Sequence, residues 1–387
     1  MGKNLVVCCD GTNNEVQGNL SNVLKLYRLL VKDARQRVYY NPGIGTIAHR
    51  DAWTRLKQDA RSVFGLATGY GLDNDILGAY AFLADAYEDG DSIYLFGFSR
   101  GAYTVRALAG LIYVIGLLPR DQRNLATYAL TAYKRVAETD DLKAAFGFGR
   151  IAGARAVPIR FVGAWDTVSS VIVPRKDRVV PTLLKLPYTR SNPGVQTFRH
   201  AMAIDERRRM FRLNRWDAGQ TFKPDRFNEA THVPQDCKQV WFAGVHSDVG
   251  GGYPEAESGL AKFPLAWMVR EAESHGVLVQ HSMARHLVHG HALPGGQRMY
   301  VAPDASADQH DSMNAGWRLL EYLPKRVRWR EWDRRQFVGW YLPKAEPRMI
   351  DDPQARPLVH ASAVQRRQTP GLGYDPENFP ANYIVEN

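Results

Sequence analysis

Four short apolar runs, separated by segments of helical periodicity, constrain the fold of this chain more than any other feature. Each run is as long as a buried strand and ends at or beside a Gly or an Asp. Strands that are apolar on both faces are typical of parallel sheets covered by helices. The runs are residues 5–9, 92–96, 159–163 and 240–243. Their alternation with helical segments predicts an α/β fold with a mostly parallel sheet flanked by helices.

Two helices are predicted between these runs. One apolar face contains Leu72, Ile76, Ala79, Tyr80, Leu83 and Tyr87, and Gly90-Asp91 should end that helix. A second face contains Leu108, Leu111, Ile112 and Ile115. The 387 residues, 45% of them hydrophobic, suit one domain over residues 1–387. Four prolines interrupt residues 169–200, predicted as a lid-like insertion, and residues 290–387 are predicted as a C-terminal elaboration packed on the same domain.

The pentapeptide Gly97-x-Ser99-x-Gly101 lies between the strand SIYLFGF and the helix GAYTVRALAGLI. A nucleophilic serine needs such a tight strand-to-helix turn, and small residues on both sides let the turn close. The helix N-terminus also directs N–H groups toward the turn. These flanks favour a nucleophilic Ser99 over the alternative, a structural turn of small residues.

A serine hydroxyl becomes a strong nucleophile only when a histidine accepts its proton and an acid orients that histidine. Asp166 follows the run at 159–163, and His246 follows the run at 240–243. We therefore predict Ser99, Asp166 and His246 as a catalytic triad at the carboxyl ends of the strands. The alternatives are an Asx-turn for Asp166 and an ordinary loop histidine for His246.

The oxyanion of the transition state requires hydrogen-bond donors. We predict the backbone N–H groups of Arg100, Gly11 and Thr12 as these donors, with Asp10 bracing its turn. An ordinary Asp-Gly turn is the alternative for the segment at residues 10–11.

No metal or cofactor is expected. His246 and Asp248 could ligate a metal, but the sequence shows no second ligand cluster, and Asp248 is kept as a supporting residue. The glycines of VGGG lack the Gly-Lys-Ser/Thr of a phosphate-binding loop. Three cysteines without metal-like spacing are expected to be buried in strands.

Five ordered motifs resemble one family. CCDGTNN, GFSRGAYTVRALAGLI, FVGAWDTV, RHAMAIDERRRMF and VWFAGVHSDVGGGY are similar to the catalytic domain of type VI secretion phospholipase effectors of the Tle group. The resemblance spans roughly residues 1–290, and HASAVQRR at 360–367 looks like a further element. It implies an α/β-hydrolase fold and a serine esterase that, in the effectors, cleaves phospholipid acyl esters. By motif match Ser99 is the nucleophile and Asp166 and His246 are its partners, while His310 and His360 remain alternatives for the histidine.

The net charge is +10, and residues 318–368 contain twelve Lys and Arg against six Asp and Glu. This bias favours an anionic partner, for which we expect a phospholipid surface rather than nucleic acid. Arg326, Arg328 and Arg330 predict a strand with one basic face. Arg207, Arg208 and Arg209 are expected on the solvated face of a helix, with a contact to a lipid head group or phosphate as the alternative.

No transmembrane helix is expected, because the longest uncharged apolar stretch, residues 107–119, is too short to span a bilayer. The N-terminal residues do not resemble a secretory signal, so the expected location is the cytoplasm, or export without a cleavable leader. We predict a serine hydrolase for esters, with phospholipid or other lipid acyl esters as the expected substrates. The rival is a non-catalytic hydrolase-fold protein that binds anionic lipid or nucleic acid through its basic C-terminal surface.

Overall fold

The computed structural model describes residues 2–11, 19–43, 71–168, 172–173, 182–183, 186–293, 295, 299–326, 332, 336–350 and 356–387. The central sheet has eight strands in the order β15-β14-β10-β7-β4-β3-β1-β2, and every neighbouring pair is parallel. These strands are β1 (Asn4–Cys9), β2 (Gln36–Asn41), β3 (Ser92–Phe98), β4 (Ile159–Trp165), β7 (Val195–Ala203), β10 (Asp236–Phe242), β14 (Leu358–His360) and β15 (Ile384–Glu386). The predicted α/β fold with a parallel sheet is therefore confirmed.

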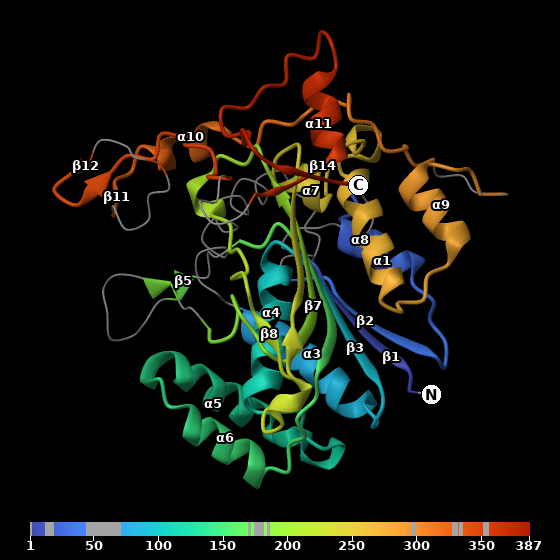
Figure 1. Ribbon diagram of the computed structural model, residues 1–387, viewed down its shortest axis with the longest axis vertical. Helices are drawn as coiled ribbons and strands as arrows, with labels where there is room; N and C mark the ends of the chain where they lie inside the picture. The colour runs from blue at the N-terminus through green and yellow to red at the C-terminus, as the bar shows by residue number, and fades with distance from the viewer. Residues whose placement is uncertain are drawn as a thin grey trace, which may run out of the picture.

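Helices cover both faces of this sheet, as Figure 1 shows. One face packs on α3 (Leu72–Ala86), α4 (Arg100–Val114), α5 (Ala126–Thr139) and α6 (Leu142–Ile151). The other face packs on α1 (Asn22–Leu29), α8 (Lys262–Ser274) and α9 (His281–His289). Side chains of β1 alternate between the two cores: Leu5, Val7 and Cys9 face the first, and Val6 and Cys8 the second. This two-sided burial explains why the strand sequences are continuously apolar.

The remaining elements are short. They are η1 (Arg120–Leu125), β5 (Ile172–Val173), β6 (Thr182–Leu183), η2 (Arg209–Phe211), β8 (Thr221–Phe222), η3 (Glu229–Thr231), β9 (Val233–Pro234), α7 (His246–Gly250), η4 (Glu255–Glu257), α10 (Ala315–Glu321), β11 (Lys325–Arg326), β12 (Gln336–Phe337), β13 (Trp340–Tyr341) and α11 (Ala361–Gln368). In the described part of the chain, none of the helices is both long and apolar enough to cross a membrane.

Strand β7 corrects the predicted extent of the insertion at residues 169–200. The predicted insertion includes the first six residues of this strand, yet the strand lies in the sheet between β4 and β10. Arg199 and His200 interrupt the apolar pattern of this strand, so the sequence does not indicate it. Both are buried and satisfied, since Arg199 pairs with Asp236 and Glu271, and His200 accepts the Thr167 N–H. Within the rest of the insertion, most residues from 169 to 185 lie outside the described ones.

The C-terminal segment also contributes to the sheet. Strands β14 and β15 extend it beyond β10, so the last part of residues 290–387 belongs to the central architecture. The predicted basic strand is described only at Lys325–Arg326, and Arg328 and Arg330 lie outside the described residues. Two of the basic residues in this segment, Arg348 and Arg366, are buried, which reduces the basic surface.

Candidate active site

Ser99 occupies a strained turn between β3 and α4. Its backbone has φ 56° and ψ −118°, a conformation that an L-residue rarely adopts. The turn is fixed because the Ser99 N–H donates to the Trp165 carbonyl at 3.0 Å, at the end of the neighbouring strand β4. The Ser99 side chain is 5% exposed, and it makes no hydrogen bond to a described residue. A reactive hydroxyl could be held in this way without a competing partner.

Gly97 and Gly101 allow the turn to close, for a reason of space. A Cβ on Gly97 would lie 2.4 Å from the Gly101 carbonyl oxygen. A Cβ on Gly101 would lie 2.1 Å from the carbonyl oxygen of Cys9, at the end of β1. Helix α4 therefore starts in backbone contact with β1, and only glycine permits that approach.

Replacing Gly101 with alanine should lower the free energy of unfolding by about 2 kcal/mol or more, because the obstacle is backbone that cannot move aside. The midpoint of urea unfolding measures this change. Gly147→Ala in α6 is the matched control, since nothing lies within 4 Å of its added Cβ. The control should be neutral or stabilising by up to about 1 kcal/mol. Equal midpoints for the two variants would contradict the packing argument.

Asp166 and His246 meet at the carboxyl edge of the sheet. Asp166 follows β4, and His246 is the first residue of α7, just after β10. The His246 Nδ1 lies 2.5 Å from the Asp166 Oδ2, and both side chains are buried. Asp166 Oδ1 also accepts the Ala203 N–H at 2.9 Å. With Nδ1 engaged by the carboxylate, Nε2 is the nitrogen left to accept a proton.

Two aromatic rings hold the His246 imidazole. Phe98, the residue before Ser99, lies 4.7 Å away between ring centroids, and Phe211 lies 4.9 Å away, edge to face. The contact with Phe98 brings His246 to the end of β3, beside the turn that carries Ser99. No hydrogen bond joins the Ser99 hydroxyl to His246 in this structure, in which both residues are described.

Charged partners set the protonation of this pair. Burial opposes ionisation of Asp166, but the Arg348 guanidinium and the His246 hydrogen bond hold the pKa of its carboxyl well below the usual value. Burial lowers the pKa of His246, although Asp166 acts in the opposite direction. At neutral pH the pair is thus a carboxylate and a neutral imidazole, the state that a general base requires.

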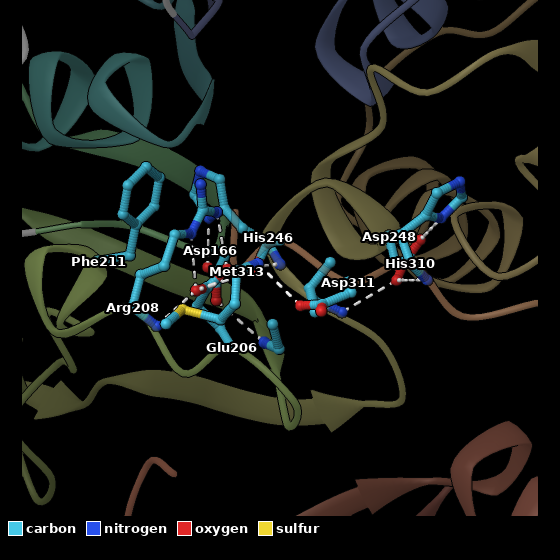
Figure 2. A network of polar contacts seen from close by, with 12 residues as sticks. Asp166, Glu206, Arg208, Phe211, His246, Asp248, His310, Asp311 and Met313 are labelled. Carbon is cyan, nitrogen blue, oxygen red and sulfur yellow. Dashed lines mark hydrogen bonds and ion pairs between the residues drawn. The ribbon is translucent and has the colours of Figure 1, made fainter. Parts of the chain in front are cut away.

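Glu206 and Arg208 complete the surroundings of His246, and sequence reasoning did not assign them a role at the site. Glu206 is buried, accepts the His246 backbone N–H at 3.2 Å, and binds the Arg208 guanidinium through both oxygens. The Arg208 guanidinium lies 3.6 Å from the centroid of the Phe211 ring. Figure 2 shows this group around Asp166 and His246. The signal was present in the motif HAMAIDERRRMF, where acid and base are two residues apart.

The prediction that the three consecutive arginines lie on the solvated face of a helix is wrong. Arg209 begins the single turn η2 and is partly buried, with its Nε 3.6 Å from Glu346, while Arg208 binds Glu206. Only Arg207 is largely exposed, in a loose pair with Glu377 at 3.6 Å. The buried partner of Arg208 is the nearby Glu206, whereas that of Arg209 is Glu346 on a distant segment, which the local sequence does not indicate.

His310 and His360, the alternative histidines, lie in other environments. His310 bridges Asp248 at 2.7 Å and Glu257 at 3.0 Å, and its ring stacks on Tyr253. Figure 2 shows His310 and Asp248 apart from the group around His246. His360 caps α11, and burial lowers its pKa to about 4. His246 is the histidine that contacts Asp166.

Asp248, predicted as a supporting residue, lies in the first turn of the short helix α7. Its carboxylate accepts the Val245 N–H at 3.0 Å and caps the short helix α7, which begins with His246. The bond to His310 attaches this helix to the segment at residues 310–313.

The predicted oxyanion donors are only partly brought together. Arg100 is the first residue of α4, directly after Ser99. The Gly11 N–H donates to the Asp10 carboxylate at 2.7 Å, so in this structure it is engaged by its neighbour. Asp10 also accepts the Ser21 and Tyr40 hydroxyls and thereby links β1 to α1 and β2. Thr12 lies outside the described residues.

The chain resembles known proteins in sequence and in structure. The chain is 35% identical over 229 residues to the uncharacterised protein YEL023C of Saccharomyces cerevisiae. This match covers 54% of the chain and 32% of the yeast protein. The chain thus spans about a third of the length of this curated relative. The solved structures that resemble it include an uncharacterised protein from Pseudomonas aeruginosa, with 18% identity, TM-score 0.37 and coverage of 72% of this chain and 46% of the other. Another is the Tle1 effector bound to the VgrG spike, with 20% identity, TM-score 0.35 and coverage of 67% and 53%.

A family model provides the assignment. The model for the catalytic domain of Tle1-like phospholipase effectors of the type VI secretion system matches residues 3–271. This range contains Ser99, Asp166 and His246, and it extends over more than half of the chain. The chain therefore belongs to the family of Tle1-like catalytic domains of type VI secretion phospholipase effectors.

Proposed function

We propose that this chain is a serine hydrolase that cleaves carboxylic esters, with phospholipid or other lipid acyl esters as its substrates. The observation that carries the proposal is the strained Ser99 turn, with the buried Asp166–His246 pair packed on the neighbouring Phe98. Membership of a phospholipase-effector family supports a lipid ester as the substrate.

The proposed reaction uses Ser99 as the nucleophile and the Asp166–His246 pair as the base. Ser99 Oγ attacks the ester carbonyl carbon while His246 Nε2 takes its proton, and Asp166 stabilises the imidazolium. The tetrahedral intermediate expels the alcohol, which receives the proton from His246 and leaves an acyl group on Ser99. Water, deprotonated by the same nitrogen, then releases the fatty acid and restores the serine. The N–H of Arg100 is a donor for the oxyanion, and a second donor requires the β1 turn to release Gly11 or to supply Thr12.

A fluorophosphonate probe tests the nucleophile directly, because only an activated serine reacts with it. We expect the probe to label the wild-type chain and to leave Ser99→Ala unlabelled. A hydrolysis screen over short esters, long-chain esters and phospholipid vesicles should then give its highest activity on a long-chain substrate. Absence of labelling in the folded wild-type protein would favour the rival proposal, a non-catalytic protein that binds anionic lipid.

A further inference from the structure

Arg348 lies far from the triad in the sequence, yet it binds the predicted catalytic acid. It belongs to the segment between β13 and β14, and its guanidinium is 182 residues from Asp166 along the chain. Its Nη1 donates to Asp166 Oδ1 at 2.6 Å, and its Nη2 donates to Asp166 Oδ2 at 3.0 Å. Such a bidentate ion pair fixes the plane of a carboxylate as well as its position.

The guanidinium is itself held from two sides. Nη1 also donates to the Ala203 carbonyl at 3.0 Å, and Nη2 to the Phe211 carbonyl at 2.7 Å. The Arg348 carbonyl accepts the Asn378 side-chain amide at 3.0 Å. Arg348 is 5% exposed and Asp166 is fully buried, so water screens their interaction little. These contacts fix the Asp166 carboxylate with its Oδ2 directed toward His246.

The charges that face His246 are balanced. Asp166 faces it from the end of β4, Glu206 and Arg208 from the loop after β7, and Arg348 from the segment before β14. On its own helix, Asp248 is engaged by His310. Two carboxylates and two guanidiniums thus surround a neutral imidazole. Because Arg348 Nη2 and His246 Nδ1 both contact Asp166 Oδ2, the two nitrogens are at most about 5.5 Å apart.

We propose that Arg348 is the positioning residue of the triad. Its bidentate ion pair orients the Asp166 carboxylate, and its positive charge keeps the His246 imidazole neutral and able to accept a proton. The electrostatic part concerns the imidazole alone, while the catalytic consequence rests on the proposed hydrolase function. Without Arg348, a buried carboxylate would be left to attract a proton to His246.

Titration of the His246 ring by NMR tests the electrostatic part without any activity assay. The chain has 11 histidines, so the His246 signal is assigned by its loss in His246→Gln. In Arg348→Met the pKa of His246 should rise by about one unit or more, as expected for removal of a like charge at this distance. Glu206→Gln removes a negative charge from the same surroundings and should shift that pKa downward. An unchanged pKa in folded Arg348→Met overturns the proposal.

Arg348→Lys separates charge from geometry, and it carries the test if loss of the buried pair prevents Arg348→Met from folding. Lysine keeps the positive charge but cannot bind both carboxylate oxygens and two carbonyls. We expect a smaller rise in the His246 pKa than for methionine, with kcat lowered on the order of tenfold or more and KM nearly unchanged. Wild-type kcat in Arg348→Lys would overturn the positioning role.

The acidic limb of the kcat/KM profile should move upward in Arg348→Met by the amount seen in the titration, because only the neutral imidazole accepts a proton. Failure of the hydrolase proposal would look different. The wild-type chain would then show neither ester hydrolysis nor fluorophosphonate labelling, and the NMR titration would still decide whether Arg348 controls His246.

Discussion

Replacing Ser99 with alanine should abolish ester hydrolysis and leave the fold intact. Loss of a triad nucleophile costs on the order of 10⁴-fold or more in turnover, because no other group at the site forms the acyl intermediate. The Ser99 hydroxyl makes no hydrogen bond to a described residue, so its removal should change the free energy of unfolding by less than about 1 kcal/mol. Steady-state hydrolysis and urea unfolding measure the two effects on one preparation.

Ser274→Ala is the matched control for this substitution. Ser274 ends α8, and its neighbour His275 accepts a hydrogen bond from Tyr94, near the start of β3 and thus at the opposite edge of the sheet. This variant should keep wild-type activity. If Ser99→Ala retained a tenth of that activity in a clean preparation, Ser99 could not be the nucleophile.

Replacing Asp166 with asparagine should damage both activity and stability. The two carboxylate oxygens accept hydrogen bonds from Ala203, Arg348 and His246, whereas an amide offers one acceptor and one donor group. The His246 tautomer would no longer be fixed, which costs about 10⁴-fold in kcat in a comparable triad. Arg348 would also lose the buried carboxylate that it binds, at a cost of about 3–5 kcal/mol in unfolding free energy.

The control for this variant is Asp217→Asn, which removes a carboxylate from a surface pair with Arg190. Both partners are about half exposed, so its loss should cost less than about 1 kcal/mol and leave turnover unchanged. Turnover of Asp166→Asn within tenfold of wild type would exclude Asp166 as the acid. Activity loss without any loss of stability would instead contradict the inferred role of Arg348 as its buried partner.

The sheet and its covering helices could be predicted because burial leaves a periodic pattern. β1 and β3 are apolar on both faces, and the face of α3 recurs at helical spacing, so each sequence segment reports its own environment. β7 could not be recognised, because Arg199 and His200 are buried against partners elsewhere in the chain. β14 and β15 have only three residues each at the end of the sheet, too few to form a pattern.

By itself, the sequence determined the strand–Ser99–helix turn and the two strand ends that carry Asp166 and His246. Parallel strands end at one edge, so residues at their carboxyl ends are brought near each other by the topology alone. Only the tertiary structure decided that His246, rather than His310 or His360, contacts Asp166, and that Arg348 clamps that acid. A pairing across 182 residues leaves no periodicity in the sequence, because it arises where a buried carboxylate requires a compensating charge from whichever segment the fold brings beside it.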